Sequence, residues 1–209
     1  MIINYNGVES FKIQTGSFIL AFNPVSKDSK FKTMRFGADT VCVSTNLPDF
    51  NGIDQNDAKN KELLVIDGPG EYETAGVFIK GFATKTEYGG KSLINTIYSV
   101  LLEGMTIGFL GALGEIINGE IIECLGDVDI LFVPIGGEGV LSASDANKLA
   151  VKLGAKIIIP MHYGEVGEKD ALKKFLKESG SEDIKAVEKL TIKKNDLLSK
   201  DGEVIVLES

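Results

Sequence analysis

Two mainly apolar runs, residues 128–134 (VDILFVP) and 155–160 (AKIIIP), constrain the fold of this chain most strongly. Each has the pattern of a β-strand that is covered on both faces. Between them, residues 142–154 carry the signals of a helix: Ser142 stands at the N-cap, Asp145 completes a capping box, and Gly154 marks the end. A buried strand, a helix and a second buried strand predict a layered α/β domain with helices outside sheets.

The first two-thirds of the chain is dominated by short β-like runs between turn residues. Residues 10–22 predict a hairpin around Gly16, and residues 101–109 predict another around Gly104. Residues 114–126 predict a short helix and residues 168–180 an amphipathic one, and a final hairpin is expected across Lys200, Asp201 and Gly202. No linker-like segment interrupts this pattern, so we expect one domain over residues 1–209.

Composition excludes several classes of function. The net charge of −8 and the sequence pI near 4.8 disfavour nucleic acid and anionic membranes as partners. We expect no signal peptide and no membrane-spanning segment. Cys42 and Cys124 are expected to be free, buried thiols, which together with the absence of a signal peptide predicts a cytoplasmic location. The chain has one histidine, so no mechanism that needs several imidazoles is available to it.

Three side chains are candidates for chemistry. Asp49 lies in a loop, residues 44–51, directly after a buried strand, and could be a general base or metal ligand, or accept backbone hydrogen bonds in a turn. His162 follows another buried strand, where a lone histidine is more often a hydrogen-bonded structural residue than a ligand. Cys42 paired with His162 could form a dyad, but a thiol inside an apolar strand should have a raised pKa, which disfavours a nucleophile.

Several blocks, in order along the chain, resemble the metallo-β-lactamase fold superfamily. They are GVESFKIQTGSFILAFNP, ADTVCVSTNLPDFNG, VIDGPGEYETAGVFIKGFAT, NTIYSVLLEGMTIGFLGALG, GDVDILFVPIGG and AKIIIPMHYG. They are most similar to the branch of L-ascorbate-6-phosphate lactonase-like, metal-dependent hydrolases. The resemblance implies a four-layer αββα sandwich. It also implies a site for one or two divalent ions, usually zinc, at the edge of the sandwich.

The metal loop of that family has the form T-H-x-H-x-D-H. In STNLPDF the three histidine positions hold Thr45, Leu47 and Phe50, and only Asp49 agrees. The position of the third histidine falls at Thr86, or at Lys85 if the gap is placed one residue earlier. The bridging aspartate of the family becomes Ala112, while His162 retains the terminal histidine.

The resemblance therefore implies the fold without the complete ligand set. A catalytic zinc needs about three protein ligands and an open position for water, and Leu47 and Phe50 cannot ligate a metal. We expect no metal, no cofactor and a non-catalytic binding or assembly protein, whose partner is a small molecule or another copy of the chain. The alternative is a hydrolase with a single ion on Asp49 and His162, helped by Glu87 or Glu115.

The resemblance also brings Asp49 and His162 close together. A buried carboxylate needs a partner, so we expect His162, with Lys85 as a further cation, to contact Asp49 directly. The predicted remnant of the family's site then comprises Thr45, Leu47, Asp49, Phe50, Lys85, Thr86, Ala112 and His162.

Overall fold

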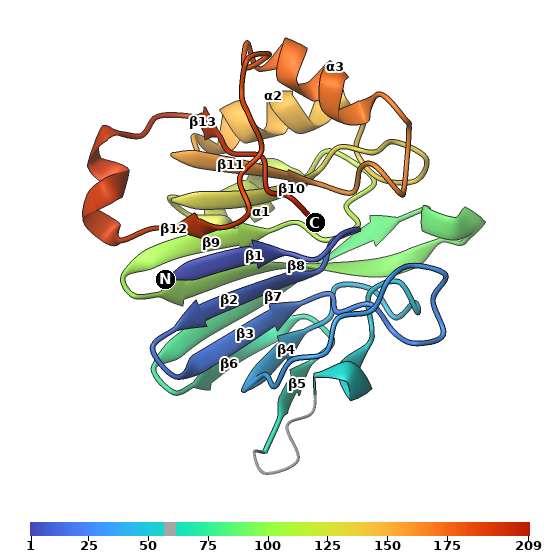
Figure 1. Ribbon diagram of the computed structural model, residues 1–209, viewed down its shortest axis with the longest axis vertical. Coiled ribbons are helices and arrows are strands. Elements are labelled where there is room, and N and C mark those ends of the chain that lie inside the picture. The colour runs from blue at the N-terminus through green and yellow to red at the C-terminus, as the bar shows by residue number, and fades with distance from the viewer. Residues whose placement is uncertain (57–61) are drawn as a thin grey trace.

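The computed structural model describes residues 1–56 and 62–209, and it contains two β-sheets that pack face to face (Figure 1). In spatial order, the first sheet consists of β12 (Leu190–Thr191), β1 (Ile2–Tyr5), β2 (Phe11–Thr15), β3 (Phe18–Phe22), β4 (Thr40–Cys42) and β5 (Leu64–Ile66). The second consists of β13 (Glu203–Val204), β11 (Ile157–Met161), β10 (Ile130–Pro134), β9 (Met105–Phe109), β8 (Leu93–Leu102), β7 (Val77–Thr86) and β6 (Gly70–Thr74).

The predicted hairpins and buried strands are confirmed for the most part. β2 and β3 pair antiparallel around Gly16, and β8 and β9 pair antiparallel around Gly104. The two apolar runs become β10 and β11, which pair in parallel and are buried along their whole length. Parallel pairing requires a crossover between the strands, and the helix predicted from Ser142 to Gly154 provides it.

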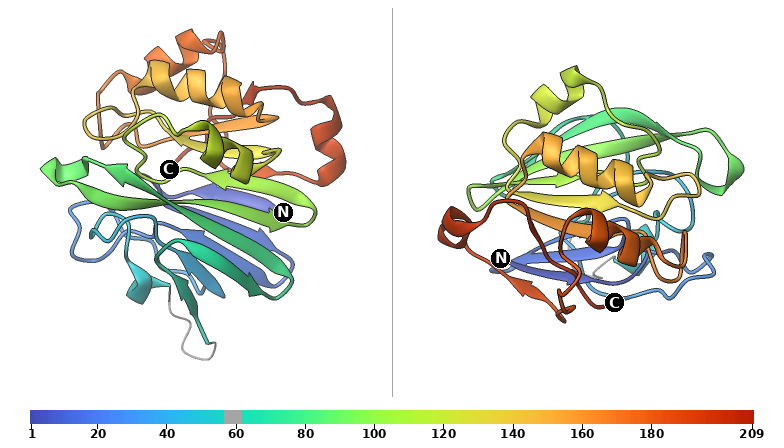
Figure 2. Two further views of the ribbon diagram at one scale, coloured as in Figure 1. Left: turned by 180° about the vertical axis from the view of Figure 1, so that it is seen from behind. Right: turned by 90° about the horizontal axis from the view of Figure 1, so that it is seen from above.

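The α-helices among the described residues cover the outer face of the second sheet (Figure 2). They are α1 (Gly119–Leu125), α2 (Ala143–Leu153) and α3 (Ala171–Glu178). The Ser142 side chain accepts the Asp145 N–H, and Gly154 ends α2 in a left-handed conformation, as predicted. No helix in the described part of the chain is long and apolar enough to cross a membrane.

The first sheet has a thinner outer layer. Residues from the segment before β4, including Phe36 and Ala38, pack there with the 3₁₀-helix η1 (Ile53–Gln55) and β-strand side chains such as Val41. The core lies between the sheets, where Phe22 stacks on Phe109 with ring centroids 4.3 Å apart. The two packed sheets and the helices over the second sheet are those of the αββα sandwich that the resemblance implied, while in the described residues loops and η1 cover the first sheet.

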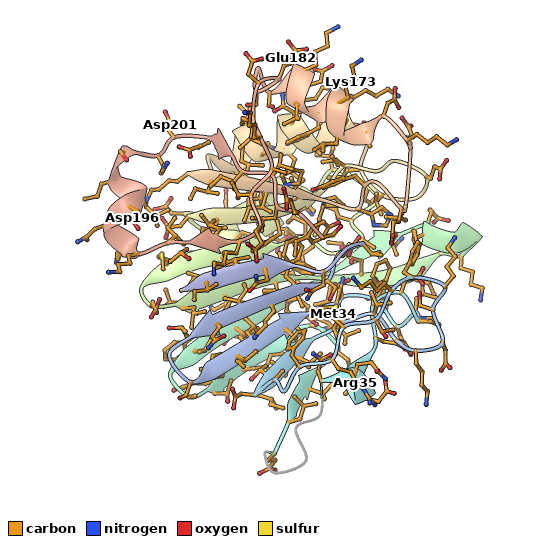
Figure 3. The ribbon with its side chains drawn as sticks, viewed as in Figure 1. Met34, Arg35, Lys173, Glu182, Asp196 and Asp201 are labelled. Atoms are coloured by element: carbon orange, nitrogen blue, oxygen red, sulfur yellow. The ribbon has the colours of Figure 1, made fainter. Side chains whose placement is uncertain are left out.

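The prediction of a C-terminal hairpin across Lys200 to Gly202 is wrong. β12 pairs with β1 at the edge of the first sheet, whereas β13 pairs in parallel with β11 in the second. The 3₁₀-helix η3 (Lys194–Ser199) connects them and buries Leu197 in the core between the sheets. The turn-like sequence at residues 200–202 does not indicate these pairings, because β12 and β13 pair with the edges of two different sheets. Charged side chains on this part of the chain, including Asp196 and Asp201, point outward (Figure 3).

Candidate functional site

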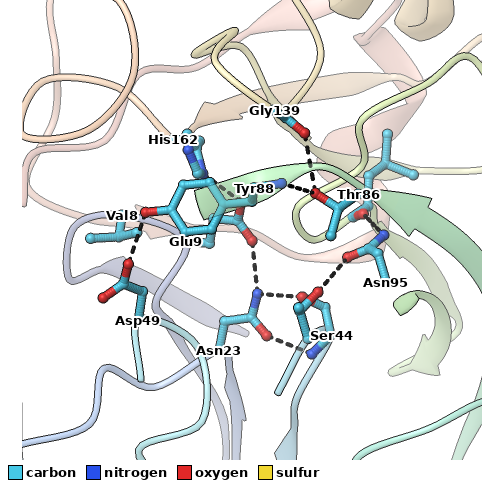
Figure 4. A network of polar contacts seen from close by, with 12 residues as sticks. Val8, Glu9, Asn23, Ser44, Asp49, Thr86, Tyr88, Asn95, Gly139 and His162 are labelled. Atoms are coloured by element: carbon cyan, nitrogen blue, oxygen red, sulfur yellow. Dashed lines mark hydrogen bonds and ion pairs between the residues drawn. The ribbon is translucent and has the colours of Figure 1, made fainter. Parts of the chain in front are cut away.

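A buried polar network lies at one edge of the sandwich, where the loops after β1, β3, β4 and β11 meet the tip of the β7–β8 hairpin (Figure 4). Its centre is the pair Glu9 and His162, whose side chains are both fully buried. His162 Nδ1 lies 2.6 Å from Glu9 Oε1, although 153 residues separate the two in sequence. His162 also donates its backbone N–H to the Val8 carbonyl oxygen at 2.7 Å, and holds a left-handed backbone with φ of 62°.

Asn23 fixes the second oxygen of Glu9. Asn23 Nδ2 donates to Glu9 Oε2 at 2.8 Å and to Ser44 Oγ at 2.7 Å, while its Oδ1 accepts the Ser44 backbone N–H at 2.7 Å. A carboxylate at position 23 could not donate to Glu9 and would repel it, so an asparagine suits this position.

Asp49 does not contact His162 directly, so our prediction for its partner is wrong. Its Oδ1 accepts a hydrogen bond of 2.5 Å from Ser29, and its Oδ2 accepts one of 2.8 Å from the Tyr88 hydroxyl. Two neutral hydroxyl donors therefore satisfy the carboxylate that we expected a cation to hold. Lys85 is exposed and, within the described residues, is not ion-paired with Asp49.

Tyr88 connects the two halves of the site. Its hydroxyl binds Asp49, and its ring packs edge-on against the His162 ring with centroids 5.1 Å apart. It belongs to the one-turn 3₁₀-helix η2 (Tyr88–Gly90) at the hairpin tip. Burial raises the pKa of Tyr88 strongly, and the hydrogen bond and charge of Asp49 and the charge of Glu9 raise it further. The hydroxyl therefore stays protonated and can donate to Asp49.

The positions where the family has metal ligands are largely packed with apolar side chains. Phe50 and Ala112 are fully buried in one cluster, against which Leu47 and Tyr88 pack. Thr45 donates to Asn95 Oδ1 at 3.3 Å, and Thr86 donates to the Gly139 carbonyl oxygen at 3.1 Å. The structure thus gathers the predicted residues at one edge, with the exposed side chain of Lys85 outside the network.

The described residues do not fit the zinc centre of the family. Within residues 1–56 and 62–209, no three His, Cys, Asp or Glu side chains are grouped so that they could share a metal ion. Both oxygens of Asp49 already accept hydrogen bonds, and Nδ1 of His162 is held by Glu9. A zinc site needs about three converging ligands with free lone pairs, which this donor set does not provide.

Cys42, the candidate nucleophile of a dyad with His162, lies in surroundings that do not favour a thiolate. Cys42 is fully buried in the core between the sheets, and burial raises the pKa of its thiol well above the ordinary value, as predicted. The prediction that Cys124 is also buried is wrong, because this side chain is exposed on α1. His162 is, as the sequence favoured, a hydrogen-bonded residue with a structural partner.

Sequence reasoning missed Glu9, Ser29 and Tyr88. Glu9 carries no clear signal in the sequence, because it precedes an alternating strand, Phe11–Thr15, beside which a carboxylate is usually solvated. Ser29 and Tyr88 carry no signal either, because both reach Asp49 through loops whose paths depend on the whole fold.

Comparison with known proteins supports the assignment of the fold. The Beta-lactamase superfamily domain matches residues 2–162. Among curated proteins, a UPF0173 protein of Pyrococcus furiosus is 41% identical over 56 residues, which cover 27% of this chain and 26% of that protein. The UPF0173 metal-dependent hydrolase of Listeria innocua is 39% identical over 62 residues, which cover 30% of this chain and 27% of that protein. Each match spans only about a quarter of the relative's length.

A solved structure resembles the whole chain. A Thermotoga maritima protein of the metallo-β-lactamase superfamily is 27% identical with a TM-score of 0.79, and the match covers 99% of this chain and 98% of that one. The metallo hydrolase Igni18 of Ignicoccus hospitalis shares the fold at 17% identity with a TM-score of 0.66, covering 99% of this chain and 94% of that one. The family model covers most of the chain, which therefore belongs to the family of the Beta-lactamase superfamily domain.

Proposed function

We propose that this chain has retained the fold of the metal-dependent hydrolases without their metal chemistry, and that it functions as a non-catalytic binding protein. The observation that supports the proposal is the packing at the positions where the family has its metal ligands. Phe50 and Ala112 pack in one buried cluster, and the remaining polar groups, Glu9, Asp49 and His162, are each held by protein hydrogen bonds.

The physical reason is the chemistry of the side chains. Zinc catalysis requires an ion that lowers the pKa of a bound water or polarises a carbonyl group, and both effects depend on ligands that hold the ion at an open position. Methyl, phenyl and hydroxyl groups at positions 112, 50 and 45 are poor ligands for such an ion. An altered single-ion centre would need Glu87 or Glu115, and both are exposed. Neither belongs to a group of three potential metal ligands among the described residues.

Metal analysis tests this proposal directly. The protein is purified without chelators, and zinc, manganese and iron are counted per chain by mass spectrometry. We expect much less than one ion per chain, and no release of any metal after denaturation. About one metal ion per chain would refute the proposal. A smaller amount of metal that is present in the wild-type protein and absent from the His162→Gln variant would also refute it. An unrelated exposed carboxylate, Glu203→Gln, provides the matched control.

A further inference from the structure

A cavity lies on the outer face of the first sheet, where Asn4 on β1 and Lys12 on β2 are cross-strand neighbours that both line it. Its volume is about 590 Å³. In the view of Figures 1 and 3, the C-terminus lies on one side of β1, and the labelled Met34 and Arg35 lie on the other. The volume is within the range of sites for drug-sized ligands, so the cavity can hold a compact organic molecule.

The side chains of Lys12, Lys32 and Arg35 form a basic wall of this cavity. Contacts with the protein hold two of them in place. Lys12 Nζ lies 5.5 Å from the centroid of the Phe36 ring, and Phe36 lines the same cavity. Arg35 Nε donates to Gln55 Oε1 at 3.1 Å. None of the three basic side chains forms an ion pair with another described residue, so their charges are available to an anionic group of a ligand.

The side chains of Glu165, Glu188 and Glu208 form an acidic wall of the cavity. Glu188 and Glu208 belong to neighbouring segments, because Val187 and Leu207 form an isolated parallel bridge and Glu208 donates its backbone N–H to the Val187 carbonyl oxygen at 2.9 Å. Like charges on adjacent segments repel each other. These carboxylates also form no ion pair in the described part of the chain, so the two walls line one cavity without neutralising each other directly.

Basic and acidic side chains in equal number favour a ligand that carries both charges. An anion alone would leave the acidic wall without a partner, and a cation alone would leave the basic wall without one. The amide side chains of Asn4 and Asn6, which also line the cavity, can both donate and accept hydrogen bonds, as a peptide group requires. Met34 and Phe36 add apolar surface.

We propose that this cavity binds a short peptide with free termini, with its carboxylate at the basic wall and its ammonium group at the acidic wall. A sphere of about 590 Å³ is about 10 Å across, and an extended chain rises about 3.3–3.6 Å per residue, so about three residues span it. A single amino acid holds its two charges too close together to reach both walls. The proposal goes beyond the proposed function, because neither Glu9 nor His162 lines this cavity.

Triglycine is the probe that tests the proposal. Acetyl-triglycine, which lacks the ammonium group, and triglycinamide, which lacks the carboxylate, are its matched controls. We expect saturable shifts of the backbone amide signals of Asn6 and Gly7 in nitrogen-15 NMR spectra with triglycine, and binding of each blocked probe that is at least about 3-fold weaker. Equal affinity for the three probes, or no saturable shift with triglycine at millimolar concentrations, would overturn the proposal.

Two double variants assign the ends of the peptide. Lys12→Gln with Arg35→Gln should weaken triglycine binding about 3- to 10-fold at low salt and remove its advantage over triglycinamide. Glu188→Gln with Glu208→Gln should weaken it by a similar factor and remove its advantage over acetyl-triglycine. If either double variant kept the full preference for triglycine, the wall that it alters would not hold the peptide and the proposal would fail.

Matched variants at exposed positions outside the cavity control for net charge. Lys152→Gln with Lys173→Gln, and Glu182→Gln with Asp201→Asn, change the charge of the chain by the same amounts and should leave affinity unchanged; Lys173, Glu182 and Asp201 are labelled in Figure 3. Equal weakening by the control variants and the cavity variants would contradict the assigned site. Metal content, measured separately, decides the proposed function whatever the peptide titration shows.

Discussion

Removal of the Glu9 carboxylate should destabilise the protein more than removal of any exposed acidic group. In the variant Glu9→Ala, Nδ1 of His162 and Nδ2 of Asn23 lose their shared acceptor while both stay buried. Breaking a buried, hydrogen-bonded pair by removing one partner costs about 3–5 kcal/mol. Two hydrogen bonds to a charged group, at about 1.5–3 kcal/mol each, lead to a similar figure.

The free energy of unfolding is measured by urea titration. The chain has no tryptophan, so circular dichroism is the appropriate signal. For a chain of this size we expect the melting temperature to fall by about 6–20 °C. Glu203→Ala is the matched control: this glutamate is paired with Lys200 at the surface, and its loss should cost about 0–1 kcal/mol.

Glu9→Gln separates the role of charge from that of shape. The glutamine side chain keeps one acceptor oxygen but places its amide group against one of the two buried donors, His162 Nδ1 or Asn23 Nδ2. The loss in free energy of unfolding should therefore fall between those of Glu9→Ala and the control. If Glu9→Ala destabilised the protein no more than Glu203→Ala, the Glu9–His162 pair would not support this edge of the sandwich. The reasoning about the network would then be refuted.

Two further predictions concern packing and pH. Phe50→Ala should lower the free energy of unfolding by about 3–5 kcal/mol because the ring is fully buried. The substitution Leu198→Ala, at an exposed position, should change it by less than about 0.5 kcal/mol, and equal effects of the two substitutions would show that the cluster around Phe50 is not tightly packed. Burial raises the pKa of Tyr163 to about 12 and that of Tyr88 further still. In the unfolded chain a tyrosine loses its proton near pH 10, so above that pH the folded state binds more protons than the unfolded state. The free energy of unfolding should therefore be unaffected by these tyrosines below pH 10 and should decline as the pH rises from there through the folded pKa values. Urea titrations from about pH 8 to about pH 11 should show this decline, with a shallower slope in Tyr163→Phe; a flat profile would contradict it.

Much of the fold could be predicted because its signals are local. The cap of α2 at Ser142, its end at Gly154 and the turn at Gly16 depend on residues only a few positions apart. The apolar runs of β10 and β11 specify burial on both faces wherever those strands are placed. Where the outcome depended on which sheet edge a strand reached, as for β12 and β13, local signals predicted the wrong pairing.

The sequence by itself determined which side chains this edge of the sandwich has for chemistry: one histidine, and Leu47, Phe50 and Ala112 at positions where the family has ligands. That information is in the residue types and needs no coordinates. Only the tertiary structure decided the partners, since it brings Glu9 to His162 across 153 residues and Tyr88 to Asp49 across 39. Polar groups buried on folding pair with whichever donor the packed loops bring within about 3 Å, and those loop paths follow from the assembly of both sheets.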